Sequence, residues 1–198
     1  MIPVEQRFER VVQQILEQGR AVIDGLFPDQ ILSHLLHRLT DLREEEALRP
    51  AAIGAAGQAE VHTEIRSDNI RWWSDHPSDP SECAYLAHID ALSTYLNRTC
   101  FTGIRSREFM YASYPPGAFY ARHVDDFQNK DARKFSVITY LNQHWQPSDG
   151  GELVTYGKQG PEIIPPTFGR TVIFPSPDLE HEVRITHRVR LSITGWLR

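Results

Sequence analysis

The sequence has little cysteine, no long apolar run and no excess of basic residues. Among its 198 residues only Cys83 and Cys100 are cysteines, and neither lies in a C-x-x-C motif. Two isolated thiols do not make a disulfide framework, so we expect both to be reduced in a cytoplasmic protein. No apolar run reaches the roughly 20 residues that a membrane-spanning helix needs, and the N-terminus lacks the order of a secretion signal. We therefore expect no membrane partner.

The balance of charges argues against another class of protein. With 21 Lys and Arg residues against 26 Asp and Glu residues, the formal net charge is −5, which is unlike a general nucleic-acid binder. A content of 40% hydrophobic and 24% charged residues is typical of a globular protein that buries its own core. Because no internal repeat or linker is present, we expect one domain over residues 1–198.

Helical patterns are confined to the first half of the chain. Apolar residues recur at helical spacing over residues 5–18, in a segment that begins at Asp29, and over residues 82–98. Asp29 and Ser81 are expected to cap the second and third of these helices. Residues 21–27 have the composition of a strand. Residues 1–100 are therefore predicted to be mainly a helical support.

Residues 49–80 follow no regular pattern. They begin with small residues at 49–57, continue with a possible strand that ends in the segment 64–73, and finish with a polar stretch rich in Ser, Asp and Pro at 74–80. Long irregular segments in compact domains often act as lids or binding loops. We expect residues 66–80 to form a lid loop that closes over a bound substrate, and a surface excursion is the alternative.

The second half of the chain reads as short strands separated by Pro and Gly clusters. Strands at this spacing favour a sandwich, a jelly roll or a barrel. The fold class predicted is thus α+β and mainly β, with N-terminal helices that support an all-β half. The expected strands are 108–114, 118–125, 134–142, 151–156, 162–165, 170–175, 182–186 and 190–197.

His123 and Asp125 form an H-x-D motif in a segment that is predicted to be extended. Alternate side chains of a strand share a face, so these two residues point the same way. His181 lies in a later segment and must be brought to them by the fold. Two imidazoles and one carboxylate on one face suit non-haem Fe(II), which needs open positions for substrate and dioxygen. Zinc is the rival ion for such a set.

Arg190 begins the last predicted strand and shares a face with Ser192, Thr194 and Trp196. A buried row with an arginine and two hydroxyls is costly unless a polar ligand meets it. The planar guanidinium can bind a carboxylate through two parallel hydrogen bonds, and Tyr140 can add a hydroxyl donor. The alternative for Arg190 is a surface salt bridge.

These residues carry a resemblance to a known family. The chain resembles the 2-oxoglutarate and Fe(II)-dependent oxygenases, and within them the prolyl hydroxylases of the hypoxia-inducible-factor type and their bacterial relatives. The resemblance covers about residues 60–198, whereas the first 60 residues match little of it. It rests on the H-x-D motif, His181 and Arg190 together with the segments Ile65-Arg-Ser-Asp-Asn-Ile-Arg-Trp72, Met110-Tyr-Ala-Ser-Tyr-Pro115, Tyr140-Leu-Asn142 and Gly150-Gly-Glu-Leu153.

The resemblance implies a double-stranded β-helix, a jelly-roll or cupin-like core of about eight strands at residues 101–198. It implies that His123, Asp125 and His181 bind iron and that Arg190 binds the distal carboxylate of 2-oxoglutarate. The other co-substrate residues that it implies are Tyr140, Tyr114, Thr194, Met110, Ile138, Leu153, Val183 and Trp196. The substrate contacts that it implies are Arg133, Arg66, Asp68, Trp72 and Tyr120.

The implied activity is a dioxygenase reaction that hydroxylates a prolyl residue of a protein or peptide and releases succinate and CO2. Fe(II), 2-oxoglutarate and O2 would take part, with ascorbate as a reductant, and a translation factor or ribosomal protein is a candidate substrate. One alternative is the same chemistry on a free amino acid, another side chain, a small molecule or an alkylated base. The other is a β-barrel module that binds a metal or a partner without turnover.

Overall fold

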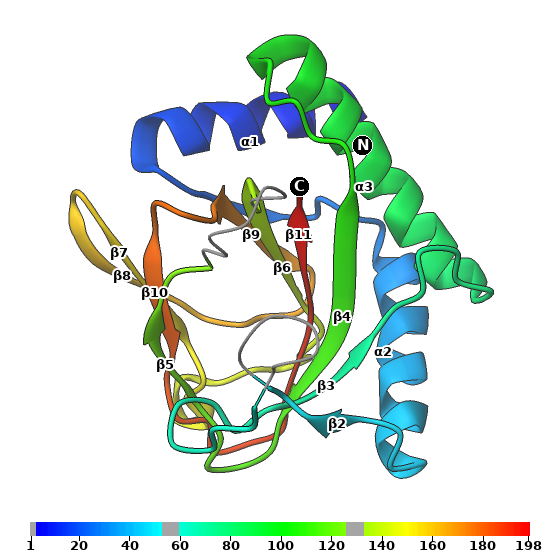
Figure 1. Ribbon diagram of the computed structural model, residues 1–198, viewed down its shortest axis with the longest axis vertical. Helices are drawn as coiled ribbons and strands as arrows, with labels where there is room; N and C mark the ends of the chain where they lie inside the picture. The colour runs from blue at the N-terminus through cyan, green and yellow to red at the C-terminus, as the bar shows by residue number, and fades with distance from the viewer. Residues whose placement is uncertain (1–2, 53–59, 126–132) are drawn as a thin grey trace.

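The computed structural model describes residues 3–52, 60–125 and 133–198. Two antiparallel sheets face each other, and three helices cover the other face of the larger sheet (Figure 1). This arrangement is a double-stranded β-helix with N-terminal helices, as the resemblance implied. Within the described residues, no helix is both long and apolar enough to cross a membrane.

The three helices lie close to their predicted positions. They are α1 (Val4–Gln18), α2 (Asp29–Glu44) and α3 (Pro80–Cys100). Helix α1 stops at Gly19, which has a φ of 76° and donates its backbone N–H to the carbonyl of Ile15 at 2.8 Å. Glycine adopts this left-handed conformation without the steric cost of a Cβ, so it ends the helix here.

Most strands of the larger sheet come from the second half of the chain. Its order is β1 (Ala21–Asp24), β9 (Arg170–Pro175), β6 (Phe135–Tyr140), β11 (Arg190–Leu197), β4 (Arg107–Tyr114), β3 (Asn69–Trp72) and β2 (Arg49–Pro50). The smaller sheet has the order β5 (Tyr120–His123), β10 (Glu180–Val183), β7 (Leu153–Gly157) and β8 (Gly160–Ile164). One turn of 3-10 helix, η1 (Pro147–Asp149), precedes β7.

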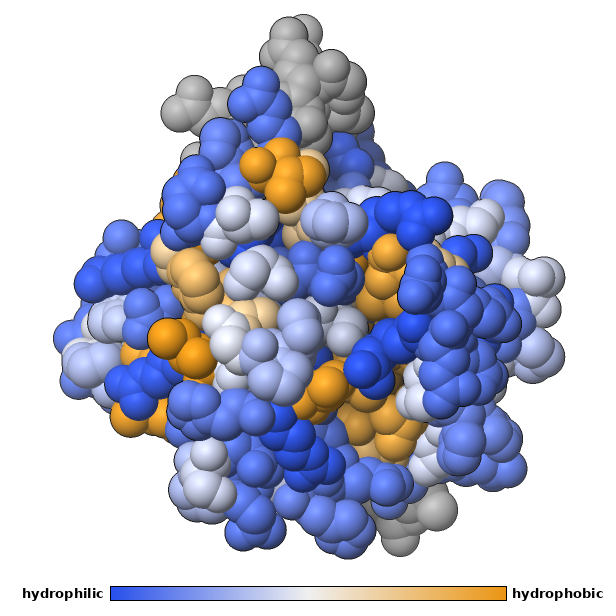
Figure 2. Space-filling view, turned by 90° about the horizontal axis from the view of Figure 1, so that it is seen from below, coloured by the Kyte–Doolittle hydropathy of each residue, from blue (hydrophilic) through white to orange (hydrophobic). Residues whose placement is uncertain are grey.

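The larger sheet separates two apolar cores. On its outer face Ile193 and Val137, both fully buried, pack with helix residues such as Leu92 and Leu35. On its inner face residues such as Ile138 meet the smaller sheet. Alternation along the strands assigns side chains to the two cores. On the face seen in Figure 2, hydrophobic residues appear only in small separate groups.

Two local predictions were wrong, and a third was met in part. A possible strand was expected to end at Trp73, and Asn69–Trp72 do form β3, which pairs with β4 and leaves only the rest of the segment 66–80 as loop. The cap of α3 is Asp79 and not Ser81, since the Asp79 carboxylate accepts the backbone N–H groups of Ser81 and Glu82. Asp29 lies in the first turn of α2, after Pro28 at the cap position. An acidic side chain there still favours the helix through its dipole.

Two further predictions were only partly met. The strand predicted over residues 21–27 ends at Asp24. Of the small-residue loop predicted at 49–57, Arg49–Pro50 form the short strand β2, while residues 53–57 lie outside the described residues. Neither difference moves an element that contributes to the site.

We predict that Leu92→Ala lowers the free energy of unfolding by about 2 to 5 kcal/mol, because it leaves a cavity between α3 and the larger sheet. Leu92 is 1% exposed, whereas Leu16 on α1 is 81% exposed. Leu16→Ala is therefore a matched control and should change the free energy by less than about 0.5 kcal/mol. Denaturant unfolding followed by circular dichroism measures both, and equal effects would contradict this account of the core.

Candidate metal centre and co-substrate pocket

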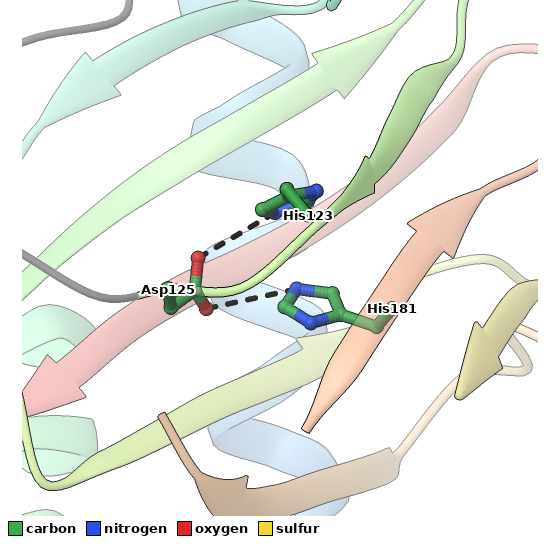
Figure 3. Close-up of side chains that lie close together, drawn as sticks. All are labelled: His123, Asp125 and His181. Atoms are coloured by element: carbon green, nitrogen blue, oxygen red, sulfur yellow. Dashed lines mark ion pairs between the residues drawn. The ribbon is translucent and has the colours of Figure 1, made fainter. Parts of the chain in front are cut away.

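His123, Asp125 and His181 converge between the two sheets. His123 ends β5 and pairs in register with His181 of β10, so both imidazoles lie on the inner face of the smaller sheet. Their ring centroids are 4.3 Å apart. Asp125 follows β5, and one ligand atom from each of the three residues lies within 4.8 Å of the others. Figure 3 shows the carboxylate beside the two rings, with one oxygen directed at each.

The histidines are oriented by backbone carbonyls. Nδ1 of His123 lies 2.7 Å from the carbonyl of Ala121, and Nδ1 of His181 lies 3.0 Å from that of Leu179. A carbonyl can only accept a hydrogen bond, so each Nδ1 carries a hydrogen, and Nε2 is the ring atom that can bind a metal. The two Nε2 atoms lie 3.5 and 3.6 Å from the Asp125 carboxylate. Metal-binding histidines are commonly held in this way.

The protonation states also suit a metal ion. Burial by itself would raise the pKa of Asp125, but its interactions with His123 and His181 and a hydrogen bond from Ser136 hold that pKa well below its usual range. Burial lowers the pKa of His181. Near neutral pH the set therefore offers a carboxylate and a neutral buried imidazole, the forms that bind metal. Two histidines and one carboxylate fit Fe(II) with open positions.

Arg190, at the start of β11, faces the space between the two sheets, beside Tyr114 and Tyr140 of the inner core. It is 1% exposed, and its Nε donates to the carbonyl of Gly151 at 2.8 Å. Its guanidinium lies 4.8 Å from the ring centroid of Tyr114 and 5.0 Å from that of Tyr140. Among the described residues, no carboxylate forms an ion pair with Arg190. A buried cation without an anion is costly, so the pocket fits an acidic ligand.

Two tyrosine hydroxyls border this pocket as donors. Burial raises the pKa of both Tyr114 and Tyr140, which keeps their hydroxyls protonated near neutral pH. The Tyr140 hydroxyl is buried and has no hydrogen-bond partner among the described residues. An unsatisfied buried hydroxyl beside an unpaired guanidinium is the arrangement expected where a carboxylate binds.

The other predicted pocket residues lie on the inner face. The expected alternation of β11 is confirmed, since Thr194 pairs in register with Met110 of β4 and Ile138 of β6. Across the space, Leu153 of β7 pairs with Val183 of β10, on the same face as His181. Met110, Ile138, Leu153, Val183 and Trp196 are all between 0% and 6% exposed. They can exclude water from the co-substrate.

Three of the residues predicted to contact substrate form a stack behind His123. Arg66 donates two hydrogen bonds to the Asp68 carboxylate, at 2.8 and 2.7 Å. Its guanidinium lies 4.3 Å from the ring centroid of Tyr120, whose ring is stacked on that of His123 at 3.6 Å. Arg66 and Asp68 are thus paired with each other and lie against a ring that touches a candidate metal ligand.

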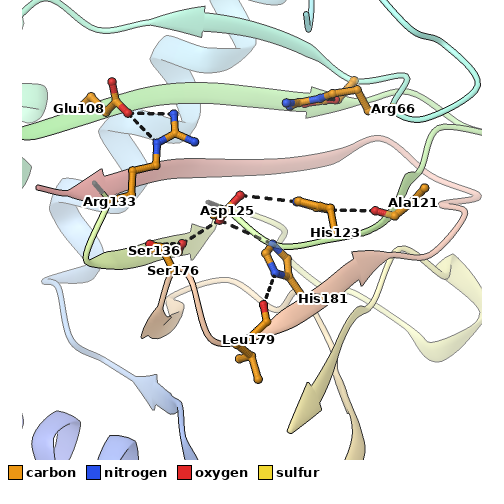
Figure 4. Close-up of polar contacts among 11 residues, drawn as sticks. Arg66, Glu108, Ala121, His123, Asp125, Arg133, Ser136, Ser176, Leu179 and His181 are labelled. Carbon is orange, nitrogen blue, oxygen red and sulfur yellow. Dashed lines mark hydrogen bonds and ion pairs between the residues drawn. The ribbon is translucent and has the colours of Figure 1, made fainter. Parts of the chain in front are cut away.

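The other two predicted substrate residues lie near Trp196, at the far end of the face of β11 that begins with Arg190. The Arg133 guanidinium is 3.4 Å from a ring centroid of Trp196, and its Nε donates to Glu108 at 2.9 Å. Trp72, 48% exposed, lies 6.0 Å from Trp196 between ring centroids. Figure 4 shows Arg133 and Glu108 on one side of Asp125. Trp72 therefore offers an accessible aromatic surface next to the pocket.

Comparison with known proteins agrees with this geometry. A family model described as the 2OG-Fe(II) oxygenase superfamily matches residues 109–198. The mouse (Mus musculus) prolyl hydroxylase EGLN3 is 30% identical over 199 residues, which cover 95% of this chain and 82% of that protein. The chain belongs to the prolyl hydroxylase family of these oxygenases. Fe(II), 2-oxoglutarate and O2 are accordingly its cofactor and co-substrates.

Two solved structures of the family have the same fold. A prolyl-4-hydroxylase from Pseudomonas putida is 35% identical, has a TM-score of 0.87, and is matched over 96% of this chain and 98% of its own. A prolyl hydroxylase from Trichoplax adhaerens, in complex with a peptide of a hypoxia-inducible-factor oxygen degradation domain, is 28% identical. Its TM-score is 0.88, with 98% of this chain and 90% of that chain covered.

Two serines at the site were not predicted from the sequence. Ser136 on β6 donates to Asp125 Oδ2 at 2.7 Å, and its Oγ is 2.8 Å from that of Ser176, which follows β9. Serines are common in strands and turns, and these two are separated by 40 residues along the chain. Only the alternation of β6, which points Ser136 inward with Ile138 and Tyr140, could have suggested the first of them.

We predict that His181→Ala abolishes tight binding of Mn(II), used as an air-stable substitute for iron, because it removes one of three ligands. Isothermal titration of the metal-free protein measures this. His34, which is exposed on α2, supplies the control, and His34→Ala should bind Mn(II) as the unaltered protein does. Retention of full affinity by His181→Ala would show that the metal binds elsewhere.

Proposed function

We propose that this chain is an Fe(II)- and 2-oxoglutarate-dependent dioxygenase that hydroxylates a prolyl residue in a protein or peptide. One observation carries the proposal. A set of two histidines and one aspartate with metal-binding geometry lies in the same buried space as a guanidinium, Arg190, that has no carboxylate partner among the described residues. A metal site and an anion site together suit a metal-dependent enzyme with an acidic co-substrate.

His123, Asp125 and His181 would hold the iron. Bound there with 2-oxoglutarate, Fe(II) supplies the oxidation of a C–H bond by O2, with succinate and CO2 as the other products. The chain contributes the orientation of the ligands. The carbonyls of Ala121 and Leu179 fix the two imidazoles by accepting their Nδ1 hydrogens. The protein thus positions and isolates a reaction that its cofactor carries out.

Arg190 would bind the distal carboxylate of 2-oxoglutarate. Its guanidinium can donate two parallel hydrogen bonds, and the free hydroxyl of Tyr140 can donate a third. Thr194 lies further along the same face of β11, and Tyr114 pairs in register with Arg190 from β4. The buried apolar residues around them keep water away from the co-substrate, which strengthens these hydrogen bonds.

Tyr120 and Trp72 would contact the prolyl ring, and Arg133 the substrate chain beside it. Tyr120 is stacked on His123, so a ring bound against it lies beside the metal centre. Trp72 supplies an exposed aromatic face, and Arg66 and Asp68 hold Tyr120 in place. Residues 73–79, between β3 and α3, are the part of the predicted lid that remains irregular and can close over a bound peptide.

The substrate would be a cytoplasmic protein, and translation factors and ribosomal proteins are the first candidates to assay. Cys83 and Cys100 are both free and exposed, which supports a reducing compartment. The Trichoplax adhaerens relative was solved with a peptide, and this supports a peptide substrate here as well. Ascorbate would serve in the assay as a reductant of the iron.

We predict that Arg190→Lys raises the KM for 2-oxoglutarate at least about tenfold, because an ammonium cannot make the two parallel hydrogen bonds of a guanidinium. Succinate release at varied 2-oxoglutarate measures this. Arg188, two positions earlier and exposed, is the matched control, and Arg188→Lys should leave the KM within about twofold. An unchanged KM in Arg190→Lys would place the co-substrate carboxylate elsewhere.

We predict that the enzyme adds one oxygen atom to a proline of a substrate protein, and only with Fe(II), 2-oxoglutarate and O2 present. Proteins captured by the inactive Asp125→Ala variant, then incubated with the unaltered enzyme, would reveal the modified residue by mass spectrometry. The control peptide carries alanine in place of that proline.

Other outcomes would favour the alternatives. Consumption of 2-oxoglutarate stimulated by free amino acids or other small molecules, with no hydroxylated proline, would indicate a different target of the same chemistry. Zinc retained at the site, with no consumption of 2-oxoglutarate after iron is added, would indicate a non-catalytic module.

A further inference from the structure

Two buried serines connect Asp125 to the larger sheet. Ser136 is 1% exposed and Ser176 is 0% exposed. Both are fixed by backbone pairing, since Ser136 pairs in register with Phe174 of β9 and the Ser176 N–H donates to the carbonyl of Lys134 at 3.0 Å. Figure 4 shows the two hydroxyls in line with the Asp125 carboxylate. Asp125 is thus joined directly to β6 and, through Ser136, to the residue that follows β9.

The direction of these hydrogen bonds follows from counting hydrogens. An ionised carboxylate can only accept, so the single hydroxyl hydrogen of Ser136 goes to Asp125 Oδ2, 2.7 Å away. The Ser136 oxygen must then accept the hydrogen of Ser176, 2.8 Å away. The order is therefore Ser176 to Ser136 to Asp125. Each donated hydrogen bond polarises the next, most effectively in a buried site.

We propose that Ser136 and Ser176 are positioning residues of the metal centre, which hold one oxygen of Asp125 on the sheet so that the carboxylate offers its other oxygen to the metal. A carboxylate can bind a metal through one oxygen or both. Binding through both would take one of the positions that a dioxygenase keeps open for its co-substrate and O2. The inference rests on the proposed function only for the identity of the metal and the use of those positions.

The hydrogen-bond pattern distinguishes a role in positioning Asp125 from the general need of buried hydroxyls for hydrogen-bond partners. On the outer face of the same strand, the Thr139 hydroxyl lies 2.9 Å from that of Tyr85 and 3.0 Å from that of Thr171. That chain of hydroxyls is also buried but ends at no ionised group. It is a matched internal control, because β6 carries both chains on opposite faces.

The test measures binding of Co(II) to the metal-free protein, by titration and by the visible absorption of the bound ion. We expect Ser136→Ala to bind Co(II) about 10- to 100-fold more weakly, as is typical when a partner of a metal ligand is removed. We also expect its absorption spectrum to change, because the coordination of Asp125 changes. Ser136→Thr keeps the hydroxyl and should restore both the affinity and the spectrum.

A double-mutant cycle tests the second serine. Ser176→Ala should weaken Co(II) binding in the same direction but less, since it acts through Ser136. The double variant Ser136→Ala/Ser176→Ala should bind no more weakly than Ser136→Ala alone. Additive losses would overturn the proposed order of the two serines, because residues that act in series are not additive.

Thr139→Val is the control for folding. It removes a buried hydroxyl of the same strand and should leave the Co(II) affinity and spectrum unchanged, whatever its effect on the unfolding temperature. Unaltered Co(II) affinity and spectrum in Ser136→Ala would overturn the inference. These readouts need no substrate, so a protein that binds Co(II) as expected but hydroxylates no proline would refute the proposed function and leave the serine inference standing.

Discussion

Strand β11 has a side that faces the helices and a side that faces the smaller sheet, and the geometry of the site depends on that alternation. Leu191 and Ile193 belong to the core under the helices, while Arg190 and Thr194 point between the sheets. A shift of one residue would bury Leu191 in the co-substrate pocket and turn Arg190 toward the helices. Hydrogen bonding to both β4 and β6, with the apolar packing of the outer face, excludes such a shift. The helices therefore fix the position of residues that they never touch.

The sequence allowed the β half of the fold to be predicted because its strands alternate and its turns carry Pro and Gly. It indicated β3 only as a possible strand ending at Trp73, because residues 69–72 give no clear alternation and the strand depends on pairing with β4. The cap at Asp79 was missed for a similar reason. Both Asp79 and Ser81 suit a cap position, and only the path of the chain decides which carboxylate or hydroxyl reaches the free N–H groups.

The site residues that could be predicted belong to types that are uncommon inside a β core, and those that were missed belong to common types. Histidine, aspartate and arginine in strands stand out, because charge inside a β core is costly without a ligand. Ser136 and Ser176 do not stand out, because a serine hydroxyl can find a hydrogen-bond partner at many buried positions. The sequence also does not show that these two serines, far apart along the chain, are partners. Arg66 and Asp68 illustrate a third case. Their segment was recognisable, but their bond to each other and the stack on Tyr120 follow from tertiary packing.

Asp125 and Arg190 are opposite charges buried in the same barrel, yet no ion pair joins them or links Arg190 to another carboxylate of the described residues. If stability alone decided the arrangement, pairing the two would offset part of the cost of burying each charge alone. Instead, hydroxyls and imidazoles surround Asp125, while aromatic rings and a carbonyl surround Arg190. A cation bound at Asp125 and an anion bound at Arg190 would each supply the missing opposite charge. A divalent cation would neutralise Asp125 and keep one positive charge, which one carboxylate of a dicarboxylic acid would balance while its other carboxylate balances Arg190. The separation of the two sites therefore favours 2-oxoglutarate over a co-substrate with one carboxylate.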